Sequence, residues 1–208
     1  MPTETFNRLR DEKQETIMRA AVHEFVENGF TRAKVSDIAL RAGIAKGSIF
    51  QYFKDKKELF VYCAQWGLEV FMKKLDAKMQ IGEMDVFTYL QNNSATAEVL
   101  QDERELALFM QVAMNEPGLL DDSMKSMMDI GKIYTVRLIQ NGKKQGTVRN
   151  DIEDEFLTDF FLAVTDKFSR RWMELYMDFT SGVSKENEMK MKNELNQMID
   201  LLKKGMGY

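Results

Sequence analysis

The side chains that most often carry out chemistry are scarce in this chain of 208 residues. There is one histidine, His23, and one cysteine, Cys63, and these two are too few ligands for a structural or catalytic zinc site. The sequence also contains no glycine-rich phosphate loop and no nucleophile elbow. We therefore expect no catalytic residue, no metal, no cofactor and no enzymatic activity. His23 is expected to face solvent, and Cys63 to be a small buried hydrophobic residue.

A group of polar and aromatic side chains that could form a binding surface occurs in residues 46–53. Ile49 and Phe53 are four residues apart, so on a helix they face the same way, and their apolar nature predicts that this side is buried. Lysine and glutamine can donate to base edges or phosphates, serine can bond a phosphate, and a phenylalanine ring can meet thymine methyl groups. The outward residues with these properties, together with a glycine that permits close approach, are Lys46, Gly47, Ser48, Phe50 and Gln51.

The residues before this segment predict the element that would hold it in place. Val35, Ile38, Ala39 and Ala42 follow the i, i+3, i+4, i+7 spacing of a short helix buried on one side. Gly43 comes directly after them and can adopt the left-handed conformation that ends a helix. Helix, glycine turn and helix form the helix-turn-helix pattern, whose second helix enters the major groove of DNA.

Two further helices are expected to flank this pattern. The first should run from about residue 10 to residue 28 and end at Gly29. The other should run from about residue 56 to residue 80, because Asp55 and Glu58 form an aspartate version of the capping box at its start. Together with the two short helices, the first would make a three-helix head.

The segment from residue 20 to residue 60 resembles the N-terminal domain of the tetracycline-repressor (TetR) family. The matching stretches are AAVHEF, Gly29-Phe30, SDIALRAGIAKGSIFQYF and KDKKELF. The resemblance implies a homodimeric, ligand-responsive transcriptional regulator, most commonly a repressor, that binds double-stranded operator DNA. By motif position it also implies that Tyr52 and Lys56 clamp the phosphate backbone. The alternative for Tyr52 and for Phe50 is that their rings pack in the small core of the head.

Two residues depart from the usual pattern of that family. Lys34 stands where a threonine commonly caps the second helix, and Ala45 stands where a serine is frequent. Either Ser36 caps this helix one turn later, or Lys34 replaces the cap by a direct phosphate contact. The loss of one cap costs only about 1 kcal/mol, so the helix is expected in both cases.

The charge is divided unevenly along the chain. The formal net charge is −4, but residues 1–57 hold 11 basic against 8 acidic side chains, while the remainder holds 18 against 25. We therefore expect a DNA-binding domain at 1–57 and an effector-binding and dimerisation domain at 58–208. If Lys34, Lys46 and Lys56 of two subunits neutralise about six phosphates, log affinity should fall with log salt at a slope of about −5.

The remainder is expected to be helical as well. With only two prolines in the chain, long stretches of good helix formers are uninterrupted, which predicts an all-α fold of about nine helices without a sheet. No signal peptide and no apolar run of 18 residues is present, so we expect a cytoplasmic protein with no membrane segment. The expected helices lie at about 84–100, 103–115, 119–144, 153–179 and 185–204.

The last two expected helices carry apolar seams. Apolar residues spaced by three and four predict packing against another helix. Phe156, Phe160 and Tyr176 lie outside the first seam, so that helix is apolar over more surface than one partner helix covers. We therefore assign the seam residues to a dimer interface. The family resemblance implies a four-helix bundle across a twofold axis, and a purely internal core is the alternative. The assigned residues are Leu157, Phe161, Val164, Phe168, Trp172, Leu175, Leu195, Met198 and Leu202.

The middle of the chain is the expected place of an effector pocket. Sixteen methionines are many for this length, and flexible methionine side chains can adapt to an irregular apolar or amphipathic ligand. Ordinary core filling is the alternative for these side chains, and a plain surface position is the alternative for the arginine among them. The assigned residues are Trp66, Phe109, Met110, Met114, Met124, Met127, Met128, Tyr134 and Arg137.

Two functions remain open on these grounds. One is a repressor that a small effector releases from a palindromic operator. The other is a family-like dimeric adaptor that binds a protein partner, with or without DNA, instead of regulating transcription. A footprint on a promoter would favour the first, and a partner bound without DNA would favour the second.

Overall fold

The computed structural model describes residues 1–116, 118–176 and 184–207. This part of the chain is helical, as predicted, and it contains one isolated antiparallel bridge, between Val148 and Gly207, but no strand. The helices are α1 (Glu4–Asn7), α2 (Asp11–Arg32), α3 (Val35–Arg41), α4 (Lys46–Tyr52), α5 (Lys56–Met79), α6 (Val86–Gln91), α7 (Asn93–Asp102), α8 (Arg104–Asn115), α9 (Leu120–Gln145), α10 (Asp154–Tyr176) and α11 (Lys185–Met206), with a 3-10 turn at Ile81–Glu83.

The chain packs as two compact units. The first consists of Met1–Lys74 and Glu98–Ile130, and the second of Leu75–Ala97 and Gly131–Tyr208. Helix α8 therefore belongs with the N-terminal helices, although it is distant from them in sequence. A functional boundary at residues 57 and 58 stays a prediction, because packing groups the helices in a different way.

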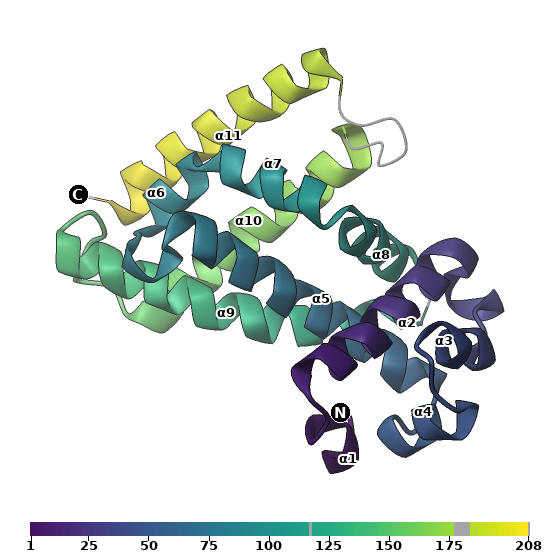
Figure 1. The fold of residues 1–208 in the computed structure, drawn as a ribbon. Coiled ribbons are helices and arrows are strands. Elements are labelled where there is room, and N and C mark those ends of the chain that lie inside the picture. Colours follow the sequence, from purple (N-terminus) through teal and green to yellow (C-terminus); the bar gives the residue numbers. More distant parts are fainter. Residues whose placement is uncertain (117, 177–183, 208) are drawn as a thin grey trace. The chain divides into compact units, whose positions relative to one another are not determined.

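The first unit is built around α2. Helices α3 and α4 lie together beside it, and the short helix α1 lies next to α4 (Figure 1). Phe25 of α2, Phe60 of α5 and Phe109 of α8 are fully buried, with ring centroids 4.9 to 6.1 Å apart. These rings hold α8 against the helices of the predicted head.

Helix α1 was not predicted, and two of the predicted helices differ from those in the structure. Helix α2 is broken at Gly29, which has φ 64° and ψ 174°, but one more turn follows it before Ala33. The helix predicted at 84–100 is interrupted, because Asn92 adopts φ −86° and ψ 53° and separates α6 from α7. The Asp85 side chain caps α6 by accepting a hydrogen bond from the Thr88 N–H at 2.7 Å.

In the second unit, α11 packs against both α10 and α6. The core between these helices is formed by apolar side chains with at most 6% exposure, namely Val86, Phe87, Leu157, Phe161, Leu195, Met198, Ile199 and Leu202. Among the described residues, no helix is both long enough and apolar enough to cross a membrane.

Candidate nucleic-acid interface

The helix-turn-helix predicted from residues 35–53 is present as α3 and α4. Ile38 of α3 and Ile49 of α4 are buried, at 0% and 1% exposure, and Phe53 directly after α4 is also buried. Gly43 has φ 63°, the left-handed conformation that closes α3. The side of α4 that carries Ile49 therefore faces the core of the first unit, and its other side is free.

The free side of α4 carries the side chains predicted to read DNA. Lys46, Gly47 and Gln51 are exposed, Ser48 is half-buried, and the Phe50 ring is 49% exposed. The alternative that the Phe50 ring packs in the core of the head therefore does not agree with its exposure. A Cβ added at Gly47 would meet no atom within 4 Å, so this part of the helix leaves room for close approach of a ligand. The group combines hydrogen-bond donors with an aromatic face, as base and phosphate contacts require.

The start of α3 tests the first of the two alternatives for its missing threonine cap, the one in which Ser36 caps the helix. Ser36 does not cap the helix, since its hydroxyl lies 3.2 Å from the Asp37 carboxylate, and the helix already begins at Val35. Lys34 occupies the N-cap position without a side-chain cap, and its backbone N–H donates to Glu24 Oε1 at 3.0 Å. The exposed Lys34 side chain remains available for a phosphate contact.

The capping box before α5 is present, with one difference from the expected geometry. The Glu58 N–H donates to Asp55 Oδ1 at 2.8 Å, as predicted. The Glu58 carboxylate accepts from the N–H of Lys54 at 2.6 Å, one residue before the N-cap. The start of α5 is thus fixed directly after the α4 helix.

Tyr52 and Lys56, the two expected phosphate clamps, are both engaged inside the chain. Tyr52 is 9% exposed and its ring meets Phe6 edge to face at 5.7 Å, which agrees with the alternative that this ring packs in the core of the head. Lys56 Nζ donates to the carbonyl oxygens of Thr31 and Ala33 at 3.1 and 3.0 Å, and lies 4.7 Å from the centre of the Phe30 ring. The ammonium of Lys56 therefore binds the end of α2, and a phosphate would have to compete with these carbonyls.

Sequence reasoning missed the attachment of α8 to α2. Glu103, 4% exposed at the start of α8, accepts hydrogen bonds from the Arg19 guanidinium and lies 2.5 Å from Lys74 Nζ. At the other end of α8, Glu116 accepts from the Phe30 N–H at 2.6 Å, beside the break at Gly29. Helix α8 is therefore tied to α2 at both ends, and residues so far apart in sequence give no local signal of this.

The electrostatics of Glu103 follow from the same contacts. Burial alone would raise the pKa of this carboxyl, but the hydrogen bonds and charges of Arg19 and Lys74 outweigh burial and lower it. A carboxyl with a lowered pKa stabilises the fold above its ordinary titration range, and this stabilisation is lost as the pH falls through the folded-state pKa. The attachment of α8 is therefore expected to weaken in acid.

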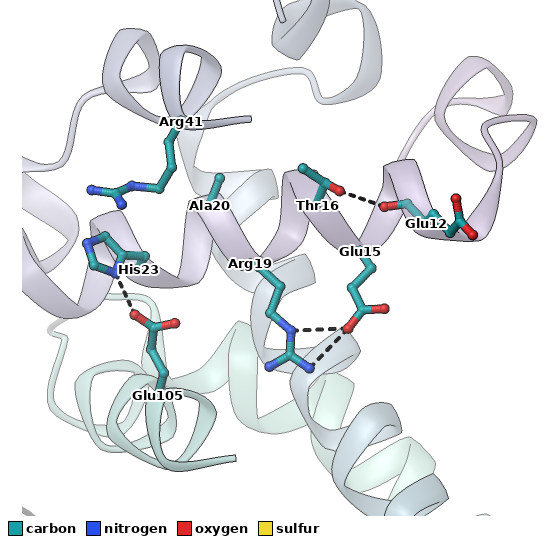
Figure 2. Close-up of a pocket in the computed structure, with 8 residues that line it drawn as sticks. All are labelled: Glu12, Glu15, Thr16, Arg19, Ala20, His23, Arg41 and Glu105. Carbon is teal, nitrogen blue, oxygen red and sulfur yellow. Dashed lines mark hydrogen bonds and ion pairs between the residues drawn. The ribbon is translucent and has the colours of Figure 1, made fainter. Parts of the chain in front are cut away.

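An open pocket of about 520 Å³ lies beside this attachment, between α2, α3 and α8 (Figure 2). His23 lies 2.6 Å from Glu105 through Nδ1 and its side chain is 32% exposed, so the expectation that it faces solvent is met only in part. The reason is that α8 covers this side of α2. Two acid–base pairs, Glu15 with Arg19 and Glu105 with His23, lie in the pocket. The lining residues are Glu12, Glu15, Thr16, Arg19, Ala20, His23, Arg41 and Glu105.

The residues predicted for an effector pocket differ in how deeply their side chains are buried. Phe109 is fully buried among the aromatic rings of the first unit, and Arg137 is exposed, the alternative considered for it. The half-buried side chains are Trp66, Met110, Met114 and Tyr134. The side chains of Met124, Met127 and Met128 lie outside the described part. Phe109 thus packs the head against α8, and a ligand could reach it only by displacing those rings.

Most of the predicted dimer seam is used within the chain itself. Leu157 and Phe161 of α10 are buried, as are Leu195, Met198 and Leu202 of α11. Val164, Phe168 and Trp172 are half-buried, with the Trp172 Nε1–H donating to Glu194 at 2.9 Å, and the Leu175 side chain lies outside the described residues. The internal-core alternative therefore accounts for the buried part of the seam.

The apolar surplus on α10 nevertheless remains on the surface. Phe156 and Phe160, four residues apart, are 64% and 42% exposed, while the Tyr176 side chain is not described. Isolated exposed hydrophobic residues are ordinary, but residues four positions apart lie on the same face of a helix, so these two rings mark one apolar strip of α10. This strip lies on the flank of the predicted seam and not on the seam itself.

Comparisons with known proteins agree with this architecture. A family model described as bacterial regulatory proteins, tetR family, matches residues 17–63. The fatty acid metabolism regulator protein of Bacillus subtilis strain 168 is 20% identical over 162 residues, covering 76% of this chain and 81% of that protein. The transcriptional repressor BepR of Brucella suis is 24% identical, covering 78% of this chain and 81% of the repressor. The crystal structure of FadR from Bacillus subtilis in complex with stearoyl-CoA superimposes with a TM-score of 0.59 at 19% identity, covering 90% of this chain and 96% of FadR.

Proposed function

Since the chain belongs to the TetR family of DNA-binding, ligand-responsive transcriptional regulators, we propose that it is a homodimeric repressor of a near-palindromic operator, released by a small effector. The single observation that carries the DNA-binding part is the exposed face of α4 with Lys46, Gly47, Phe50 and Gln51. These side chains stand on a helix whose other side is buried. A rigidly held helix with donors on its free side is what sequence readout in the major groove requires.

The contacts divide into two kinds. Gln51 is the candidate for base edges, Phe50 for thymine methyl groups, and Lys46 for a base edge or a neighbouring phosphate. Lys34 and Ser48 are the candidates for phosphates, which fix orientation but carry no sequence information. Because the Lys56 ammonium binds backbone carbonyls, we reduce the phosphate count to Lys34 and Lys46 of two subunits, about four in all.

The second copy is proposed to cover the strip of Phe156 and Phe160 on α10. Among the described side chains of α10, these two rings are the large apolar groups that the chain leaves exposed. Full burial of an exposed phenylalanine is worth roughly 1.5–3 kcal/mol, and each ring would gain the part of this that matches its exposed fraction. To bind the two half-sites of one operator, two copies related by a twofold axis must present two α4 helices about one DNA turn, roughly 34–36 Å, apart.

The effector is proposed to be apolar or amphipathic. The support is the number of methionine side chains in the middle helices and the stearoyl-CoA in the complex of the similar FadR, which makes acyl compounds the first probes to test. Binding would shift α5 and α8, both of which are packed into the helix-turn-helix unit, and so change the spacing of the two heads. The attachment of α8 to α2 through Glu103 and Glu116 gives such a shift a direct route to the head.

The DNA claim is tested by selecting fragments of the source genome with the purified protein. We expect a near-palindromic site, and log affinity that falls with log salt at a slope of about −4, given four neutralised phosphates. Recovery of random fragments, or of a protein partner that binds equally well without DNA, would favour the adaptor instead.

The effector claim needs a separate experiment. Fatty acids, acyl-CoA compounds, aromatics and cationic drugs are screened for a rise in Tm, because a ligand that binds only the folded state stabilises it. Any compound that raises Tm should also weaken binding to the selected operator. Equal operator affinity with and without the stabilising compound would reject release as the mechanism.

A further inference from the structure

The short helix α1 contacts the reading helix α4 at its C-terminal end (Figure 1). The Thr3 N–H donates to the Tyr52 carbonyl at 2.9 Å, and the Thr3 hydroxyl donates to the Gln51 carbonyl at 2.8 Å. The last carbonyl groups of a helix have no partner within the helix itself. Thr3 thus caps α4 from outside, with a residue 48 positions away from Gln51.

Phe6 holds this cap in place. Its side chain is fully buried, and its ring lies 5.7 Å from Tyr52, 5.0 Å from Phe53 and 5.8 Å from Tyr62, measured between ring centroids. The chain after α1 is in turn bound to α2, because Gln14 Nε2 donates to the Leu9 carbonyl at 2.9 Å. Helix α1 therefore connects the end of α4 to both α5 and α2.

Helix α4 depends on such outside support. It has only seven residues and includes Gly47, and its N-cap residue Ala45 makes no side-chain cap. Isolated helices shorter than about 12 residues are marginal in water, and an internal glycine lowers their stability further. The orientation of α4 must therefore come from its packing through Ile49 and Phe53 and from the cap at its C-terminal end.

We propose that Thr3 and Phe6 are positioning residues for sequence readout, which hold the C-terminal end of α4 so that Gln51 meets its base at a fixed angle. This inference rests on the proposed DNA-binding function. The residue whose carbonyl the Thr3 hydroxyl binds is also the residue predicted to select the base. Loosening this cap should therefore reduce discrimination between sequences more than it reduces general attraction to DNA.

The test compares Thr3→Val with Thr3→Ser and Thr5→Val in the full chain. Valine has the shape of threonine but lacks the hydroxyl donor, and serine keeps it. Thr5 is an exposed threonine of α1, two residues after the N-cap Thr3. We expect Thr3→Val to weaken binding to the selected operator about fivefold, the usual factor for one hydrogen bond, with unchanged affinity for a scrambled duplex and an unchanged salt slope. Thr3→Ser and Thr5→Val should match the unsubstituted protein.

A second measurement needs no DNA and so separates this inference from the proposed function. Amide hydrogen exchange of Phe53, whose N–H donates to the Ile49 carbonyl at 2.8 Å, should accelerate in Thr3→Val while the amides of α3 stay unchanged. Phe6→Leu should have the larger effect on both measurements. Unchanged exchange at Phe53, or an equal loss of affinity for operator and scrambled DNA in Thr3→Val, would overturn the inference. An unsubstituted protein without any sequence preference would instead reject the proposed function.

Discussion

Helices α4 and α10 each carry aromatic residues on more than one side, and each uses one side within the chain. In α4 the Tyr52 ring is packed against Phe6, while Phe50 stays half exposed. In α10 the Phe161 ring is 3% exposed, while Phe156 and Phe160 remain on the surface. In both helices the aromatic residue on the buried face packs within the chain. The aromatic residues beside that face stay on the surface, where a partner can bind them.

The strongest test of this difference is a pair of alanine substitutions on α10. Phe161→Ala should lower the free energy of unfolding by about 3–5 kcal/mol, the usual cost of removing a buried aromatic ring. In the dissociated chain Phe160→Ala should cost less than about 1 kcal/mol, since its ring is partly exposed there. Urea denaturation at a protein concentration low enough to keep the copies apart measures both, because the stability of a dimer would also include the interface. Similar losses of unfolding free energy at the two positions would contradict the assignment of Phe161 to the core and of Phe160 to the surface.

The next test asks whether the outside strip binds a second copy. The double substitution Phe156→Ser and Phe160→Ser should weaken self-association roughly a hundredfold or more, since each buried ring contributes roughly 1.5–3 kcal/mol. Sedimentation equilibrium measures this, and the thermal unfolding of the dissociated protein shows that the chain still folds. Leu40→Ser is the matched control, because Leu40 is 81% exposed on α3. A dimer that resists the double substitution would place the interface elsewhere.

For α4 the corresponding test is base preference. Gln51→Ala should lose about 1–3 kcal/mol of discrimination at one position of each half-site, because a glutamine that bonds a base edge is removed. Competition binding with operators substituted at single positions measures the change. Gln65→Ala, which makes the same substitution on α5, should leave the preference intact. A uniform loss across all sequences would assign Gln51 to the phosphates.

The smallest expected effect separates Lys34 from Lys56. Lys34→Ala should weaken binding to all sequences alike and flatten the salt slope by about 2 in a dimer. Lys56→Ala should lower stability, because the carbonyls of Thr31 and Ala33 lose their donor, but should leave the slope unchanged. A flatter slope for Lys56→Ala would show that this ammonium leaves the carbonyls when DNA binds.

How much of the molecule could be predicted depended on the distance over which each signal acts. The turn at Gly43 and the capping box at Asp55 are set by neighbours within a few residues, so the helix-turn-helix was predicted in detail. The partners of Lys56 lie 25 and 23 residues earlier in the chain, and those of Thr3 and Glu103 lie farther still. Spacing alone does not specify such partners, nor whether an apolar seam meets its own chain or a second one.

Cys63 offers a practical consequence for measuring the motions that regulation would require. It is the single cysteine of the chain, it is fully buried, and burial raises the pKa of its thiol well above the ordinary value. Thiol-directed reagents react with the thiolate, so the native fold should shield this residue from them. A cysteine introduced on an exposed helix would then be the only site labelled, and spin or fluorescent probes there could report the separation of the two heads directly.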